Sequence, residues 1–164
     1  MKKLTFSAVL LMSLALNGCN GSLINDNIDV SSSVVRPPTV TLEVDDNTYE
    51  TVLGSYCWEG STEKSGVCVD TVGPKELVKD KTPLQVQASE KIVFQVSDTP
   101  KPDNAHLIQI TNGEQNKVDL VENVFVAPAQ AGTYLYSYQL WWMDPKAKSV
   151  SRGDASYAFA IEVQ

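Results

Sequence analysis

The sequence TYLYSYQLW, residues 133–141, holds the strongest structural signal in this chain of 164 residues. Large apolar or aromatic side chains occupy every second position from Tyr134 to Leu140, and polar Ser137 and Gln139 fall between them. Successive side chains of a strand point to opposite faces of a sheet, so this period of two predicts a strand with one apolar face.

The C-terminal sequence SYAFAIEV, residues 156–163, repeats this alternation. It predicts a second strand that places Phe159, Ile161 and Val163 in the core and leaves Glu162 in water. Together the two strands indicate an antiparallel sheet with one buried face.

Alternation of period two dominates the rest of the chain, and no stretch keeps a helical period of 3.6 residues. Turn-forming residues separate the alternating segments, as in Asp45-Asp46-Asn47 and Asn112-Gly113. Residues 74–79 are the one segment expected to form a short helical turn. Eight or nine short strands predict an all-β fold, an antiparallel two-sheet sandwich of immunoglobulin-like type. The expected strands are residues 40–44, 51–57, 67–71, 84–88, 91–96, 106–111, 117–121, 133–142 and 156–163.

The N-terminal 18 residues have the pattern of an export signal. Lys2 and Lys3 form a positively charged start, and an apolar run follows over residues 4–16. That run is shorter than the roughly 20 residues that a membrane-spanning helix needs, so we expect it to be cleaved.

The sequence Leu16-Asn17-Gly18-Cys19 resembles a lipobox, the processing site of bacterial lipoproteins. The resemblance implies a diacylglycerol group on Cys19, cleavage before it, and anchorage by membrane lipid on the extracytoplasmic face of the cell membrane. Two or more acyl chains give lasting anchorage, whereas one binds only marginally. The alternative is an ordinary secretory signal followed by a chance cysteine.

Composition divides the mature chain into a tether and one domain. Residues 19–38 are rich in Asn, Ser, Asp and Gly and end in two prolines, so they predict the lipidated cysteine and a disordered tether. Residues 39–164 are the expected sandwich domain. Removal of Lys2 and Lys3 leaves 11 basic against 20 acidic residues, a net charge near −9, which disfavours nucleic acid as a partner.

Cys57 and Cys68 are the cysteines that remain in the mature domain. Outside the membrane paired thiols are oxidised, so the two predict a structural disulfide between neighbouring strands. A redox-active pair is the alternative. Their spacing is not that of a CxxC motif, and no neighbouring His or helix start would lower a thiol pKa.

The stretches Gly54-Ser55-Tyr56-Cys57-Trp58 and Cys68-Val69-Asp70 resemble an uncharacterised family of small Gram-positive surface lipoproteins. Residues 132–136 and 153–159 extend the resemblance, although such closing strands occur in many immunoglobulin-like domains. The resemblance implies a β-sandwich with a bridge between two cysteines and supplies no activity.

The chain has few residues suited to catalysis or to metal binding. His106 is the one histidine, and no nucleophile or carboxylate motif adjoins it. No metal site or cofactor is expected, because one histidine and a bridged cysteine pair cannot form the usual zinc site. Asp45 and Asp46 could offer oxygens to calcium, but a solvated turn explains them. Arg152-Gly153-Asp154 spells a tripeptide read by adhesion receptors, but three residues are weak evidence, and a turn before the last strand explains them without a receptor.

Four aromatic residues form the expected binding patch: Tyr56, Trp58, Trp141 and Trp142. Adjacent residues of a strand face opposite ways, so Trp141 and Trp142 cannot both lie in the core. An exposed tryptophan beside Trp58 would suit a peptide or glycan. The alternative is that it packs beneath the loop at residues 99–103.

These features predict a non-catalytic binding or interaction module on the membrane surface, whose partner is an extracytoplasmic protein, peptide or glycan. Two other functions are considered. The loop at residues 97–102 could enter a protease active site as an inhibitor, and two of the acidic residues could act as a carboxylate pair in a hydrolase.

Overall fold

The structure is a computed structural model that describes residues 36–59, 66–97, 100–147 and 149–164. The expected signal, Cys19 and nearly all of the expected tether lie outside the described residues. The described residues belong to one compact unit. No helix in the described part of the chain is both long and apolar enough to cross a membrane.

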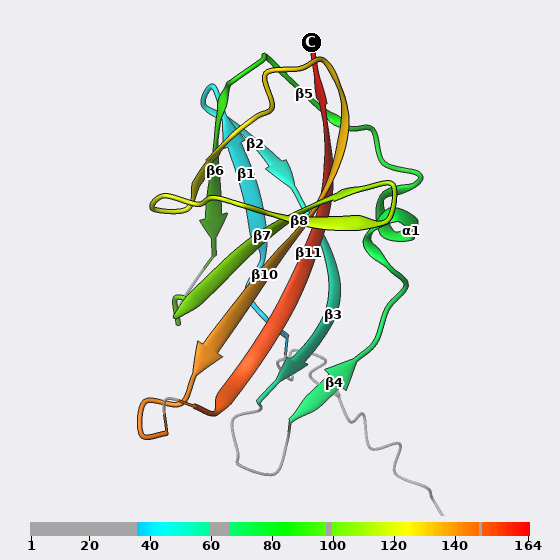
Figure 1. Ribbon diagram of the computed structural model, residues 1–164. Helices are drawn as coiled ribbons and strands as arrows, with labels where there is room; N and C mark the ends of the chain where they lie inside the picture. The colour runs from blue at the N-terminus through cyan, green and yellow to red at the C-terminus, as the bar shows by residue number, and fades with distance from the viewer. Residues whose placement is uncertain (1–35, 60–65, 98–99, 148) are drawn as a thin grey trace, which may run out of the picture. The chain divides into compact units, whose positions relative to one another are not determined.

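The first sheet has four antiparallel strands in the order β2-β1-β6-β9 (Figure 1). Their bounds are Asn47–Glu50 for β2, Val40–Val44 for β1, Lys91–Val96 for β6 and Val124–Val126 for β9. A hairpin joins β1 to β2 through Asp45 and Asp46, whose φ angles of 46° and 62° are those of a two-residue turn of type I′.

The second sheet follows the order β4-β3-β11-β10-β7-β8. Its long central strands are β10 (Gly132–Met143) and β11 (Ser151–Val163), which pair antiparallel. On either side lie β3 (Val52–Trp58), β4 (Val67–Val69), β7 (Asn104–Thr111) and β8 (Glu114–Val118). The seventh strand, β5 (Leu84–Val86), pairs with β11 in parallel.

The core lies between the inner faces of the two sheets, and aromatic rings fill its middle. Phe94 of β6 stacks on Tyr138 of β10 with ring centroids 3.8 Å apart, and it also meets Phe159 of β11 edge to face at 5.7 Å. Such aromatic pairs stabilise the fold by more than the burial of their surface area alone. The predicted all-β sandwich is therefore confirmed. The apolar faces predicted for β10 and β11 are the faces that line this core.

Alternation predicted the orientation of the C-terminal strand. Phe159, Ile161 and Val163 are buried and Glu162 is exposed. On β10 the side chains of Tyr136 and Tyr138 are also buried, as expected.

Several features differ from the sequence prediction. The strand β8 lies at residues 114–118, three residues earlier than the expected strand at 117–121. The strands β2 and β9 were not expected, because β2 is polar and exposed throughout and β9 is three residues long. The parallel pairing of β5 also departs from a wholly antiparallel sandwich. The last strand begins at Ser151, five residues earlier than expected, and thereby includes the Arg152-Gly153-Asp154 sequence.

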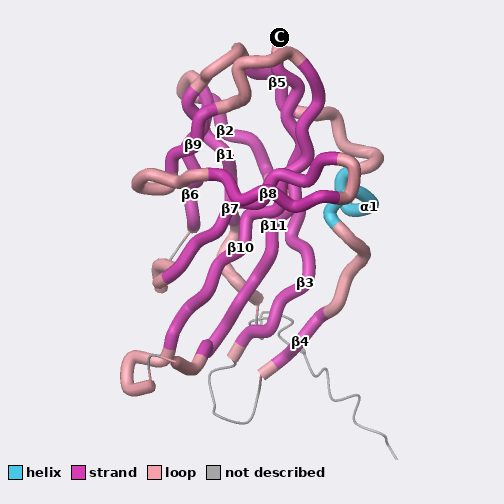
Figure 2. The backbone as a smooth tube through the Cα atoms, in the orientation of Figure 1, coloured by secondary structure: helices cyan, strands magenta, loops and turns pink. Residues whose placement is uncertain are grey.

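The single described helix, α1 (Pro74–Val78), rests on the outer face of the second sheet and confirms the helical turn expected there (Figure 2). Ser156 lies between core residues of β11 and so faces outward, at the irregularity where β11 passes buried Gly54 of β3. A Cβ at Gly54 would lie 2.6 Å from the Ser156 Oγ and 3.2 Å from the Leu77 Cδ1. Glycine thus allows α1 to approach the sheet.

Candidate functional site

Trp58 and Trp142 pack together at one end of the sandwich. Their ring centroids are 4.7 Å apart with an interplanar angle of 85°. Trp142 is 1% exposed, and its Nε1 donates a hydrogen bond of 2.8 Å to the Pro100 carbonyl oxygen. The alternative considered above was a tryptophan packed beneath the loop at residues 99–103. Trp142 is such a tryptophan, because it is hydrogen-bonded to Pro100 of that loop. Thr99 lies outside the described residues.

Trp141 faces the opposite side of the sheet. There it meets His106, which is exposed on β7, with ring centroids 5.0 Å apart. Tyr56 and Trp58 are half-buried on the inner side together with Trp142. The four aromatic residues therefore do not form one surface. Tyr56 and Trp58 are partly accessible beside buried Trp142, and Trp141 is partly accessible on the opposite face.

The disulfide between Cys57 and Cys68 is present and joins β3 to β4. The two residues are directly opposite in the antiparallel pair, with Cα atoms 4.1 Å apart. Cys68 is exposed on an edge strand of three residues. The bridge therefore fastens a strand that has few backbone contacts of its own.

The Arg152-Gly153-Asp154 sequence lies inside β11 and not in a turn. Gly153 is buried directly opposite Trp58. Arg152 is held near Glu59, with 4.0 Å between its Nε and the Glu59 Oε2. The expectation of a turn at this position is wrong, and the tripeptide is not displayed on a loop.

The remaining candidate residues lie apart from one another. Among the described residues, no group of three or more His, Cys, Asp or Glu side chains could hold a metal ion. Asp45 and Asp46 are exposed in the β1–β2 turn, where the Asn47 side chain donates to the Asp45 carbonyl oxygen at 3.0 Å.

The loop considered as an inhibitor segment is described only at its ends, because residues 98–99 are outside the described residues. The Ser97 Oγ accepts a hydrogen bond of 2.9 Å from the Thr39 backbone N–H. The Lys101 Nζ donates one of 2.8 Å to the Val96 carbonyl oxygen. Both ends of the loop are therefore fastened to the sandwich.

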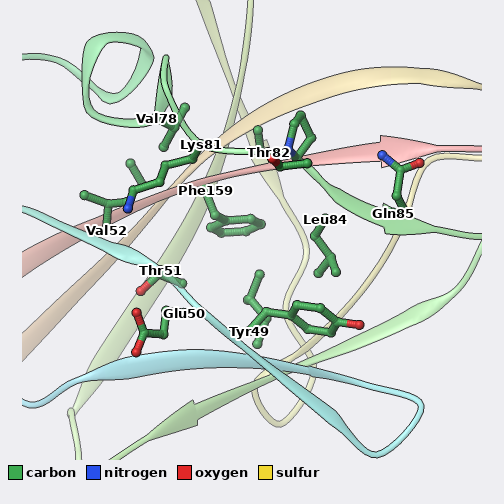
Figure 3. Close-up of a pocket in the computed structure, with 14 residues that line it drawn as sticks. Tyr49, Glu50, Thr51, Val52, Val78, Lys81, Thr82, Leu84, Gln85 and Phe159 are labelled. Atoms are coloured by element: carbon green, nitrogen blue, oxygen red, sulfur yellow. The ribbon is translucent and has the colours of Figure 1, made fainter.

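A pocket of about 460 Å³ opens where β11 changes partners. Along one edge β11 pairs with β3 as far as Ala158, and with β5 from Ile161 onward. Neither strand pairs with Phe159 or Ala160. The pocket lies in this gap, and we call it the notch pocket (Figure 3).

The lining of the notch pocket is apolar inside and polar at the mouth. Leu42, Leu84 and Phe159 belong to the buried core and form part of its floor. The polar and charged lining residues are Tyr49, Glu50, Thr51, Lys81, Thr82 and Gln85. Its volume and this division suit a small ligand with one apolar part.

Sequence reasoning did not find the notch pocket. Its walls include Tyr49 and Glu50 on β2, a strand that was not expected, and Leu84 on β5, whose parallel pairing was not expected. The gap arises because β3 and β5 share one edge of β11. No local sequence pattern indicates such an arrangement.

No protein-family model matches the chain, and comparison with curated proteins yields no match.

Proposed function

We propose that this chain is a lipid-anchored protein of the extracytoplasmic membrane surface that acts as a non-catalytic binding module. The observation that carries the binding role is the notch pocket, an open apolar cavity within the size range of small-molecule sites. The anchor rests on the lipobox sequence ending in Cys19, and the resemblance to Gram-positive surface lipoproteins points the same way.

The non-catalytic role is supported by where the reactive residues lie. His106 contacts Trp141 on the outer sheet face, away from the notch pocket. Cys57 and Cys68 are bridged, so neither is a free thiolate nucleophile. The lining of the notch pocket contains one carboxylate, Glu50, whereas glycoside hydrolysis needs two.

Tyr56 and Trp58 remain a second candidate contact surface for a peptide or glycan. Trp58, the disulfide and Gly153 line a shallow pocket of about 190 Å³ at the Trp58–Trp142 end of the sandwich. A half-buried tryptophan in such a pocket is a residue type common at binding hot spots.

The anchor is tested by expressing Cys19→Ala in the host and separating membrane from soluble fractions. We expect the variant to leave the membrane fraction, because lipid on Cys19 is the proposed attachment and the net charge near −9 opposes adsorption to anionic lipid. The matched control is Cys57→Ser with Cys68→Ser, which removes cysteines but should leave the protein on the membrane. A Cys19→Ala protein that stays on the membrane as firmly as wild type contradicts the anchor.

A further inference from the structure

The mouth of the notch pocket carries two charged groups of opposite sign. Glu50 ends β2, Lys81 follows α1, and both are exposed residues of the lining. Neither forms an ion pair with a charged group of the described residues. In Figure 3 the Lys81 side chain extends along Val52, and its nitrogen lies on the same side of the pocket as the Glu50 carboxylate. A ligand at this mouth meets one cation and one anion.

Behind these charges, apolar atoms form much of the pocket floor. The Phe159 ring lies in the centre of the view, between Leu84 and Val52 (Figure 3). Leu84 and Phe159 are almost fully buried, so these walls are fixed by the core. An apolar side chain that enters here leaves water without displacing a protein hydrogen bond.

We propose that the notch pocket binds a free α-amino acid with an apolar side chain. The ligand carboxylate pairs with the Lys81 ammonium, the ligand ammonium pairs with the Glu50 carboxylate, and the side chain lies against Phe159. This inference rests on the proposed binding function and names the ligand class of the same site.

Ligands of other charge fit the mouth less well. A simple anion would be attracted to Lys81 and repelled by Glu50, and a simple cation would be attracted to Glu50 and repelled by Lys81. A zwitterion can avoid both repulsions. A wholly apolar ligand would use neither charge.

The test measures binding of L-leucine to the full chain in detergent solution by isothermal titration calorimetry. We expect one saturable site, and about fivefold or more weaker binding of N-acetyl-L-leucine amide, which keeps the side chain and lacks both charges. Absence of saturable leucine binding by the folded protein, or equal binding of the uncharged derivative, overturns the proposal.

Variants locate the site. Lys81→Gln and Glu50→Gln should each weaken leucine binding by about two- to fivefold, because each removes one partly exposed ion pair. The matched controls Lys117→Gln and Glu114→Gln change exposed residues of β8 that do not line the notch pocket, and they should bind leucine as wild type does. Unchanged affinity in both of the first two variants overturns the assignment of the charged partners.

Filling the cavity gives an independent result. Ala160→Leu places a larger side chain in the lining and should abolish leucine binding, whereas Ala129→Leu changes an exposed alanine and should not. Circular dichroism checks that both fold; if Ala160→Leu does not, the two charge variants decide. Leucine binding that persists in folded Ala160→Leu overturns the site. Failure of leucine binding with Cys19-dependent anchorage intact rejects the ligand class and leaves the anchor standing.

Discussion

Gly153 lies directly beneath the ring of Trp58, at the point where β11 passes β3. A Cβ at this position would be 2.5 Å from the Trp58 Cε3 and 2.8 Å from the Cζ3, closer than real contacts allow. Alanine would therefore force the Trp58 ring away from Trp142. We expect Gly153→Ala to lower the free energy of unfolding by about 1–3 kcal/mol, measured by urea denaturation.

Gly66→Ala is the matched control for this substitution. Its added Cβ would lie 3.6 Å from the nearest atom, the Trp58 carbonyl oxygen, which is an ordinary contact. It should change stability little. If Gly153→Ala is as stable as wild type, the close approach of the two strands is less tight than the distances imply.

Three buried tyrosines make the fold sensitive to alkali. Burial raises the pKa of Tyr138 from 10.0 to about 12, and it raises the pKa of Tyr136 and Tyr157 further. Their neutral forms are favoured in the folded state, so this contribution to stability is fully present below about pH 10. It is lost as the pH rises from 10 toward 12 and beyond, because the unfolded chain then ionises first. The free energy of unfolding, measured by urea denaturation across this range, should fall steeply.

Tyr138→Phe separates this effect from general alkaline damage. The variant loses one titrating hydroxyl, so its stability should fall less steeply with pH than that of wild type over the same range. At neutral pH it should differ by no more than about 1 kcal/mol, because the hydroxyl makes one long hydrogen bond of 3.4 Å to the Asn123 Oδ1. An identical pH dependence in both proteins contradicts the assignment.

At the scale of elements, the disulfide decides whether β4 stays paired. The Cys57→Ser, Cys68→Ser variant should lose about 3 kcal/mol of stability, the value that the chain-entropy model gives for a loop of about 12 residues. Its melting temperature should match that of reduced wild type, since both lack the same bridge. Equal melting temperatures for the variant and the oxidised protein would remove the stabilising role.

Element boundaries followed the apolar alternation where it was strong. The bounds of β1 and β6 match the prediction because both strands alternate core and surface residues over five or six positions. The strand β2 was not predicted because none of the side chains of Asn47–Glu50 is buried. This segment is a strand because it pairs with β1. Local sequence does not encode such a partner-dependent strand.

At the scale of the molecule, alternation was enough to predict two sheets around one core. The candidate site was less predictable. Alternation correctly placed Trp141 and Trp142 on opposite faces, but it could not show that Trp142 is the tryptophan that meets Trp58. That depends on register across β10, β11 and β3, where Trp142, Gly153 and Trp58 form one row. The notch pocket depends on register in the same way.

The first described residues of the domain also set how it bears mechanical force. The Tyr157 hydroxyl donates a hydrogen bond of 2.5 Å to the Pro38 carbonyl oxygen, and β1 then runs between β2 and β6. The C-terminus lies toward the C-terminal end of β1, away from the start of that strand (Figure 1). The hydrogen bonds of antiparallel strands are perpendicular to the strand direction. A pull between the two termini therefore runs along β1 and loads its hydrogen bonds on both sides together, in shear, instead of opening them one at a time.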